Sequence, residues 1–213
     1  MARRRKRKIQ GGKTYAFVVD GQTEVWYLQM LKRNERELKI DIKPELPNKK
    51  SLEEQYRLVE ERAQDYTKVF WIVDYDVIRR ESIMAKKGTE SSEQLFIKLR
   101  NKAQKVDNVV VIVNDPCLEF WFLLHYKKTS RLFTECSAAE KQLVKYLEDY
   151  EKTEKYFTKQ GQDIYLKLKG RLGKAVEHAE DLGPFDPYYM ERAVCEMYLL
   201  FKTPEIWRVI MAD

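Results

Sequence analysis

Hydrophobic runs and amphipathic stretches alternate along the first half of the chain. Short segments rich in β-branched and aromatic residues predict strands, and apolar residues with helical spacing follow each of the first three. The predicted strands are residues 14–20, 40–46, 68–74 and 108–114. The last two are apolar without alternation, which is typical of strands covered on both faces. The order predicts an α/β fold with a four-stranded parallel sheet, right-handed crossovers and flanking helices.

Two polar pairs mark predicted helix starts. Ser51 precedes Glu54 by three residues, and Ser91 has the same spacing to Gln94, so each pair predicts a capping box. After residue 114 the strand pattern stops. The segment 115–126, DPCLEFWFLLHY, predicts a helix with its proline in the first turn, and we expect only helices beyond it.

These patterns divide the chain into three parts. We expect a basic leader over residues 1–12, an α/β domain over 13–126, and a helical C-terminal region over 127–213 that packs on the domain. The hydropathy pattern contains no run of about 18 apolar residues, so no membrane span is predicted. No apolar stretch follows the leader, which argues against a secretory signal.

The positive charge of the chain is concentrated in the leader. Six of the 40 basic residues stand there, and the remaining 34 balance the 34 acidic residues. By repelling one another they disfavour a folded leader, and they suit salt-dependent contact with the phosphates of a nucleic acid. The alternative is a solubility tail without a specific partner. The six cations are Arg3, Arg4, Arg5, Lys6, Arg7 and Lys8.

The three cysteines are widely spaced and form no CxxC motif. Cys117, Cys136 and Cys195 therefore predict reduced thiols, with neither a disulfide framework nor a zinc knuckle. Reduced thiols are typical of the cytoplasm, where we expect the protein to be located.

Acidic residues follow three of the predicted strands. Asp20 ends the first strand, Asp74 ends the third with Asp76 just beyond it, and Asp115 follows the fourth. Glu24 lies about one helical turn after Asp20 and is expected to face the same side. Glu119 stands in an otherwise apolar helix, where a buried carboxylate must be paired or bound because an unpaired one is very costly.

Parallel strands bring such residues together, because their carboxyl ends meet at one edge of the sheet. Carboxylates gathered there repel one another unless a cation lies among them, and oxygen ligands of this kind suit Mg²⁺ or Mn²⁺. Such a site can activate a water and neutralise charge on a phosphodiester. The alternative is that each acid only caps a helix or forms a turn.

Three segments resemble the RloB-like family, which is associated with bacterial restriction and phage-defence loci. They are FVVDGQTEVWYLQML (17–31), WIVDYDV (71–77) and NDPCLEFWFLLHY (114–126). The resemblance implies a TOPRIM-type fold, in which an acid after the first strand and a DxD after the third hold Mg²⁺. The family usually has Glu where this chain has Asp20, so its side chain is one methylene shorter.

The acids and the resemblance together lead us to expect a Mg²⁺- or Mn²⁺-dependent nuclease, or a related phosphodiester-cleaving enzyme, in phage defence. The expected metal ligands are Asp20, Glu24, Asp74 and Asp76, and Glu119 would complete or orient the catalytic site. Two alternatives stay open: a non-catalytic nucleic-acid-binding or regulatory subunit, and a metal-bound nucleotide sensor or transferase. It also stays open whether the substrate is DNA or RNA, whether the chain forms a homodimer, and whether it has a partner protein from a defence system.

Overall fold

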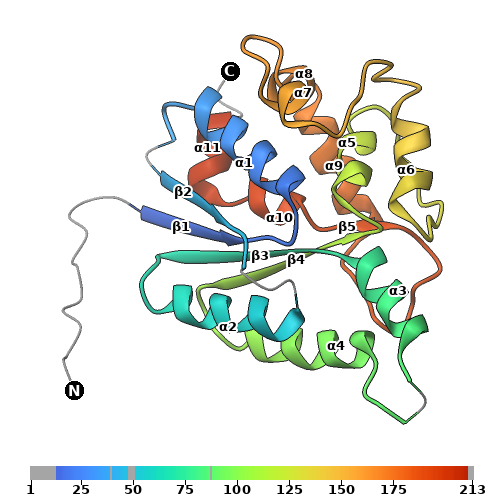
Figure 1. The fold of residues 1–213 in the computed structure, drawn as a ribbon. Helices are drawn as coiled ribbons and strands as arrows, with labels where there is room; N and C mark the ends of the chain where they lie inside the picture. The colour runs from blue at the N-terminus through green and yellow to red at the C-terminus, as the bar shows by residue number, and fades with distance from the viewer. Residues whose placement is uncertain (1–12, 39, 48–50, 87, 211–213) are drawn as a thin grey trace.

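The computed structural model describes residues 13–38, 40–47, 51–86 and 88–210. Within this part of the chain, five strands form one sheet in the order β2-β1-β3-β4-β5 (Figure 1). Strands β1 to β4 pair in parallel with one another, and β5 runs antiparallel to β4. The strands are β1 Lys13–Val18, β2 Ile40–Glu45, β3 Lys68–Asp74, β4 Val109–Asp115 and β5 Val194–Cys195.

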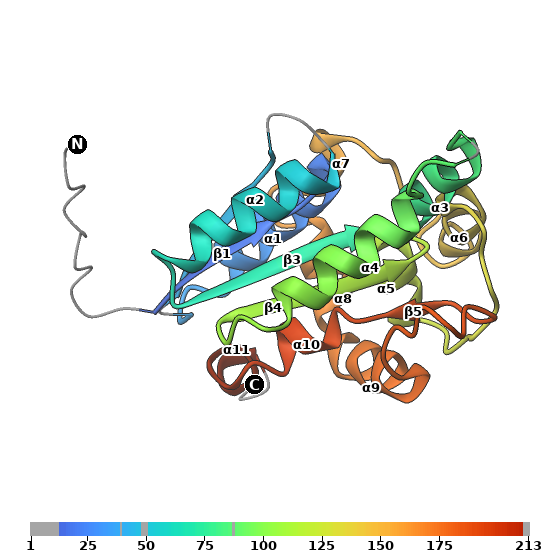
Figure 2. The same ribbon diagram turned by 90° about the horizontal axis from the view of Figure 1, so that it is seen from below.

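The central strands bury both of their faces because their residues alternate between two hydrophobic clusters. Phe17 and Ile72 point into the larger cluster, whereas Val18 and Trp71 point into the smaller one, and all four are at most 1% exposed. Helices α2 (Leu52–Ala63) and α4 (Ser92–Ala103) cover the face with the smaller cluster (Figure 2). Helix α1 (Gln22–Asn34) and the C-terminal helices cover the opposite face (Figures 1 and 2). This arrangement explains the continuous apolar runs in the sequence.

Helices connect and cover the strands. Ser91 and Gln94 form the capping box expected at the start of α4, and Ser51 accepts a hydrogen bond from the backbone N–H of Glu54 at the start of α2. The helices are α1 Gln22–Asn34, α2 Leu52–Ala63, α3 Tyr75–Met84, α4 Ser92–Ala103, α5 Leu118–Leu124, α6 Cys136–Leu143, α7 Glu154–Thr158, α8 Ile164–Lys169, α9 Leu172–Leu182, α10 Tyr198–Phe201 and α11 Pro204–Ile210.

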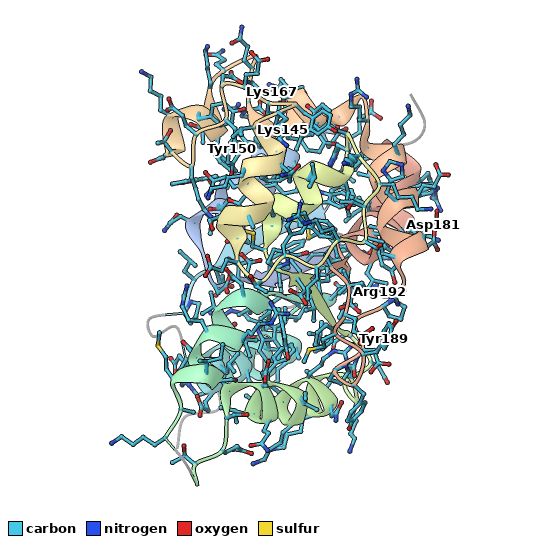
Figure 3. The ribbon with its side chains drawn as sticks, turned by 90° about the vertical axis from the view of Figure 1, so that its right-hand side faces the viewer. Lys145, Tyr150, Lys167, Asp181, Tyr189 and Arg192 are labelled. Carbon is cyan, nitrogen blue, oxygen red and sulfur yellow. A yellow bond between two sulfur atoms is a disulfide. The ribbon has the colours of Figure 1, made fainter. Side chains whose placement is uncertain are left out.

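The structure corrects the expected four-stranded sheet and the all-helical C-terminal region. Strand β5 pairs Val194 with Asp115 and Cys195 with Asn114 at the end of β4. A two-residue strand is too short for an alternating pattern, so the sequence carried no signal for it. Tyr189 and Arg192 lie in the segment that leads to this strand (Figure 3).

Two expectations about the segment around α5 were wrong. Pro116 does not lie in the first turn of the helix: it follows Asp115 through a cis peptide bond, and α5 begins at Leu118. Cys117 and Cys136 form a disulfide, so only Cys195 is a free thiol. The two half-cystines come together because α6 packs against α5, a tertiary contact that spacing along the chain does not reveal.

The basic leader lies outside the described residues, so its expected disorder and nucleic-acid contact stay predictions. None of the helices in the described segments is long and apolar enough to cross a membrane.

Candidate metal centre

Asp20, Glu24 and Asp74 come together at the carboxyl edge of the sheet. Strands β1 and β3 are parallel neighbours, so the turn after β1 and the end of β3 lie side by side. One carboxylate oxygen from each of the three residues lies within 4.8 Å of those of the other two. The convergence expected from the strand ends is therefore present for these three acids.

Gly21 allows Glu24 to take part in this group. It precedes helix α1, and Glu24 is the third residue of that helix. A Cβ atom at position 21 would lie 2.5 Å from Oε2 of Glu24. The absence of a side chain at Gly21 thus leaves room for the Glu24 carboxylate, which points back toward the start of its own helix.

Three helices begin at this edge, each with an acid in its first turn. The acids are Glu24 in α1, Asp76 in α3 and Glu119 in α5. The positive end of a helix dipole favours a carboxylate by typically about 0.3–1 kcal/mol. This is far less than the cost of burying an unpaired carboxylate, so the helix ends alone do not balance the site.

The charged forms of Glu24 and Asp74 are disfavoured in this group. Burial raises the pKa of Glu24 to about 8, and the charges of Asp20 and Glu119 add to this rise. Burial is also the main reason that the pKa of Asp74 lies well above its usual range. The charge of Glu24 makes the next largest contribution to this rise, and the charge of Asp20 comes after it. A carboxyl group whose pKa is raised in this way is stabilised in its charged form by a nearby cation.

Asp74 carries the clearest sign of a missing partner. Its Oδ1 atom is buried and has no hydrogen-bond partner within the described part of the chain. Asp74 stands at the N-cap of α3, yet its side chain makes no capping hydrogen bond, unlike Ser51 at α2 and Asp163 at α8. The cap interpretation therefore does not account for this residue. Hard oxygen donors with an unsatisfied buried oxygen fit Mg²⁺ or Mn²⁺.

Asp76 lies beside this group but is not one of its three members. Its Oδ2 accepts a hydrogen bond of 3.1 Å from the backbone N–H of Cys136, and its own N–H donates to the carbonyl of Pro116 at 3.1 Å. Its charge adds to the rise in the pKa of Asp74, after burial and the other acids. Its expected role as a metal ligand stays a prediction.

Glu119 is fully buried and paired, as the cost of an isolated buried carboxylate requires. Its Oε1 accepts a hydrogen bond of 2.8 Å from the Tyr150 hydroxyl and lies 2.8 Å from Nζ of Lys152. Burial lowers the pKa of Lys152, but the Glu119 carboxylate outweighs this effect, so the pKa lies above its usual value.

Tyr150 and Lys152 were missed by sequence reasoning. Both lie in the segment after α6, where Figure 3 shows Tyr150 on the same side of the molecule as Lys145. Their surroundings, EDYEKTEKY, look like an ordinary charged surface stretch and form no motif. Only the packing of this segment against α5 brings them to Glu119.

Asp115, at the end of β4, is held apart from the group by its own cation. Arg79 donates a 2.7 Å hydrogen bond from Nη2 to Oδ2 of Asp115, and the carboxylate is almost fully buried. Arg79 projects from α3, the helix that also carries Asp76. The ion pair therefore fixes the start of α3 against β4 and leaves Asp115 outside the candidate metal centre.

A pocket of about 310 Å³ opens beside the acids, with Asp20 and Asp74 in its wall. Arg80 and Glu81 contribute charged groups to it, and Gln55 contributes an amide. Its apolar lining comes from Leu52, Val73, Val77 and Ile78. The pocket thus places apolar surface and a cation next to the carboxylates.

Comparison with protein families identifies the chain. The model of RloB-like proteins matches residues 15–203, which is most of the sequence. The chain belongs to the RloB-like family. All five predicted site acids of this RloB-like chain lie inside the matched range, as do Tyr150 and Lys152. Neither the curated proteins nor the solved structures gave a match.

Proposed function

We propose that this RloB-like chain is a metal-dependent phosphodiesterase with a TOPRIM-like core, acting as a nuclease in phage defence. The observation that carries the proposal is the group of Asp20, Glu24 and Asp74, whose ligand oxygens lie within 4.8 Å of one another. Repulsion within this group favours a bound cation, and so does the buried Oδ1 of Asp74, which has no hydrogen-bond partner among the described residues. The association with phage defence rests on the family resemblance.

In this proposal Asp20, Glu24 and Asp74 hold Mg²⁺ or Mn²⁺. The bound ion would neutralise charge on the phosphodiester and lower the pKa of a bound water. Asp20 is one methylene shorter than the usual glutamate, yet its oxygen still lies within 4.8 Å of both partners. This distance supports a site that works with aspartate at this position.

Asp76 and Glu119 have supporting roles in the proposal. The Cys136 N–H orients the Asp76 carboxylate, and Tyr150 with Lys152 fixes that of Glu119. A ligand or positioning residue works best when its own side chain is held in one orientation. Neither residue belongs to the closest three-acid group, so we expect smaller losses from their replacement than from replacement of Asp74.

A nucleic acid is the proposed substrate. The pocket beside Asp20 and Asp74 offers apolar surface together with Arg80, a combination that suits the base and phosphate of a nucleotide. The leader, Arg3 to Lys8, would add salt-dependent attraction for the phosphate backbone.

Cleavage assays with the full chain test the proposal. Single- and double-stranded DNA and RNA are incubated with the protein and Mg²⁺ or Mn²⁺, alongside Asp74→Asn. Asp107→Asn is the matched control, because Asp107 is an exposed acid outside the site. We expect metal-dependent cleavage that is lost in Asp74→Asn and kept in Asp107→Asn.

One observation favours a non-catalytic alternative. Glu119 has Oε1 engaged by Tyr150 and Lys152, which makes it a poor candidate for proton transfer or metal binding through that atom. If the assays show metal-dependent binding of nucleic acid without cleavage, the chain is a binding or regulatory subunit. Turnover of mononucleotides but not of polymers would assign it as a nucleotide-processing enzyme.

A further inference from the structure

A second group of ligand atoms lies next to the carboxylates and differs from them in chemistry. Cys117, Glu119 and Cys136 each offer one atom, and these atoms lie within 4.8 Å of one another. Cys117 is the N-cap of α5 with Glu119 in the first turn, and Cys136 is the first residue of α6. The group is therefore built where the starts of two packed helices meet.

The contact between Glu119 and Cys136 is unusual for a purely structural disulfide. Oε2 of Glu119 lies 3.0 Å from Sγ of Cys136, and the two sulfurs are bonded to each other. A disulfide sulfur has no S–H to donate, so a carboxylate oxygen gains no hydrogen bond from it. The approach becomes favourable when the disulfide is reduced to thiols, because Cys136 can then donate an S–H, or when a cation lies between oxygen and sulfur.

Contacts to the second oxygen of the Glu119 carboxylate, Oε1, hold the group in this position. Tyr150 and Lys152 both bind Oε1, at 2.8 Å each, which leaves Oε2 directed at the sulfur. Glu119 is fully buried, so water does not compete for its carboxylate. The ligand geometry is thus fixed by contacts outside the group, as is typical of metal ligands with supporting hydrogen bonds.

We propose that reduction of the Cys117–Cys136 disulfide opens a site for a thiophilic divalent cation of the Zn²⁺ class, bound by both cysteine sulfurs and Glu119. Two thiolates and one carboxylate are ligands that Zn²⁺ accepts, and three protein ligands leave a fourth position for water or substrate. The neighbouring group of Asp20, Glu24 and Asp74 offers only hard oxygens, so the two sites select different metals.

The Cys117–Cys136 disulfide opens by thiol–disulfide exchange. A dithiol reductant supplies two electrons and two protons: the S–S bond breaks, two thiols form, and the reductant becomes a disulfide. Attack is expected at Cys136, which is half-buried, rather than at Cys117, which is 1% exposed. Cation binding then releases both thiol protons as the thiolates become ligands.

The proposed site is linked to the candidate metal centre by a direct contact. The backbone N–H of Cys136 donates a hydrogen bond of 3.1 Å to Asp76, and Glu119 is one of the five predicted site acids. A cation bound by Cys136 and Glu119 would therefore contact a residue whose backbone is hydrogen-bonded to Asp76, beside the candidate metal centre. The redox state of the pair would reach the phosphodiesterase site by this route, although the cation site itself does not depend on the proposed activity.

Co²⁺ is the probe for this site, because thiolate–cobalt bonds give a near-ultraviolet charge-transfer band that carboxylate–cobalt bonds do not. The full chain is reduced with a phosphine, freed of the reductant without air, and titrated with Co²⁺. We expect a band that saturates at one equivalent, is absent in the oxidised protein, and disappears on addition of Zn²⁺. It is expected to persist in Asp74→Asn, which separates this site from the oxygen site.

Single replacements identify the ligands. Cys117→Ser and Cys136→Ser are each expected to abolish or strongly weaken the band, whereas Cys195→Ser is the matched control, because Cys195 is the free thiol outside the group. Thermal melting of each variant checks that it is folded. A reduced, folded wild-type protein without the band would overturn the proposal, as would a band that survives both Cys117→Ser and Cys136→Ser.

Discussion

The Glu24 and Asp74 carboxylates lie side by side at one edge of the sheet, although Glu24 belongs to helix α1 and Asp74 ends strand β3. One oxygen of each lies within 4.8 Å of the other, and the charge of Glu24 raises the pKa of Asp74 further after burial has raised it. Two carboxylates held this way are unfavourable in the metal-free protein. The relationship has consequences for stability, metal affinity and pH dependence that can be measured.

The stability of the metal-free protein is expected to fall as the pH rises. The pKa of Glu24 is about 8 in the folded protein and near 4.5 in the unfolded chain, so the folded state binds the proton more tightly between these values. The contribution of Glu24 to the free energy of unfolding is fully present below about pH 4.5 and is lost progressively as the pH rises to about 8. Thermal melting in chelator at pH 5 and pH 8, with and without Glu24→Gln, measures the effect.

Glu24→Gln is expected to flatten this pH dependence and to stabilise the metal-free protein at pH 8 by up to about 4 kcal/mol, since the pKa of about 8 lies well above 4.5 and one pKa unit corresponds to about 1.4 kcal/mol. Mn²⁺ should stabilise the wild-type protein more at pH 8 than at pH 5, because protons compete with the ion. An equal pH slope in Glu24→Gln and wild type would show that Glu24 is not the titrating group.

Gly21→Ala is expected to weaken metal binding about tenfold, or by about 1.4 kcal/mol. Its new Cβ would lie 2.5 Å from Oε2 of Glu24, so the carboxylate must move away. The backbone φ of −138° suits alanine, and loss of glycine at an N-cap costs at most about 1 kcal/mol of stability. Gly170→Ala is the control, because a Cβ there meets nothing within 4 Å. Calorimetric titration with Mn²⁺ compares the two variants, and equal affinities would contradict the arrangement at Gly21.

Lys152→Met is expected to destabilise the protein by about 1–2 kcal/mol, because it leaves the fully buried Glu119 without its cation. The value is below that for a wholly buried pair, since the Lys152 side chain is 44% exposed and solvent screens its charge. Urea unfolding measures the change. Lys128→Met removes a cation from an exposed pair with Asp181 and should cost about 0.5 kcal/mol or less. Equal losses in the two variants would refute a special role for Lys152.

Local patterns were sufficient to predict the parallel part of the sheet and the meeting of three acids. Apolar runs identify β3 and β4, and the rule that parallel strands end at one edge places Asp20 and Asp74 together. The spacing of Glu24 from Asp20 was informative because helix α1 starts immediately after the turn. Each strand and helix was recognisable from residues near one another in the sequence, and the rule on strand ends then related the distant segments.

Three of the missed features depend on contacts between segments that are apart in the sequence. Strand β5 has two residues and is defined by its pairing with β4, the disulfide by the packing of α6 on α5, and the Lys152–Glu119 pair by the path of the chain after α6. None leaves a periodic pattern or a motif in the sequence. The cysteines were misinterpreted because spacing along the chain says nothing about which helix starts meet.

Calorimetric titration of the metal-free full chain with Mn²⁺, with Asp74→Asn and the exposed control Asp107→Asn measured alongside, determines directly whether the three acids bind an ion. We expect saturable binding in the wild-type protein and in Asp107→Asn, and a loss of at least tenfold in affinity in Asp74→Asn, or about 1.4 kcal/mol. Absence of binding at millimolar Mn²⁺, or equal affinity in all three proteins, would contradict a metal centre formed by Asp20, Glu24 and Asp74.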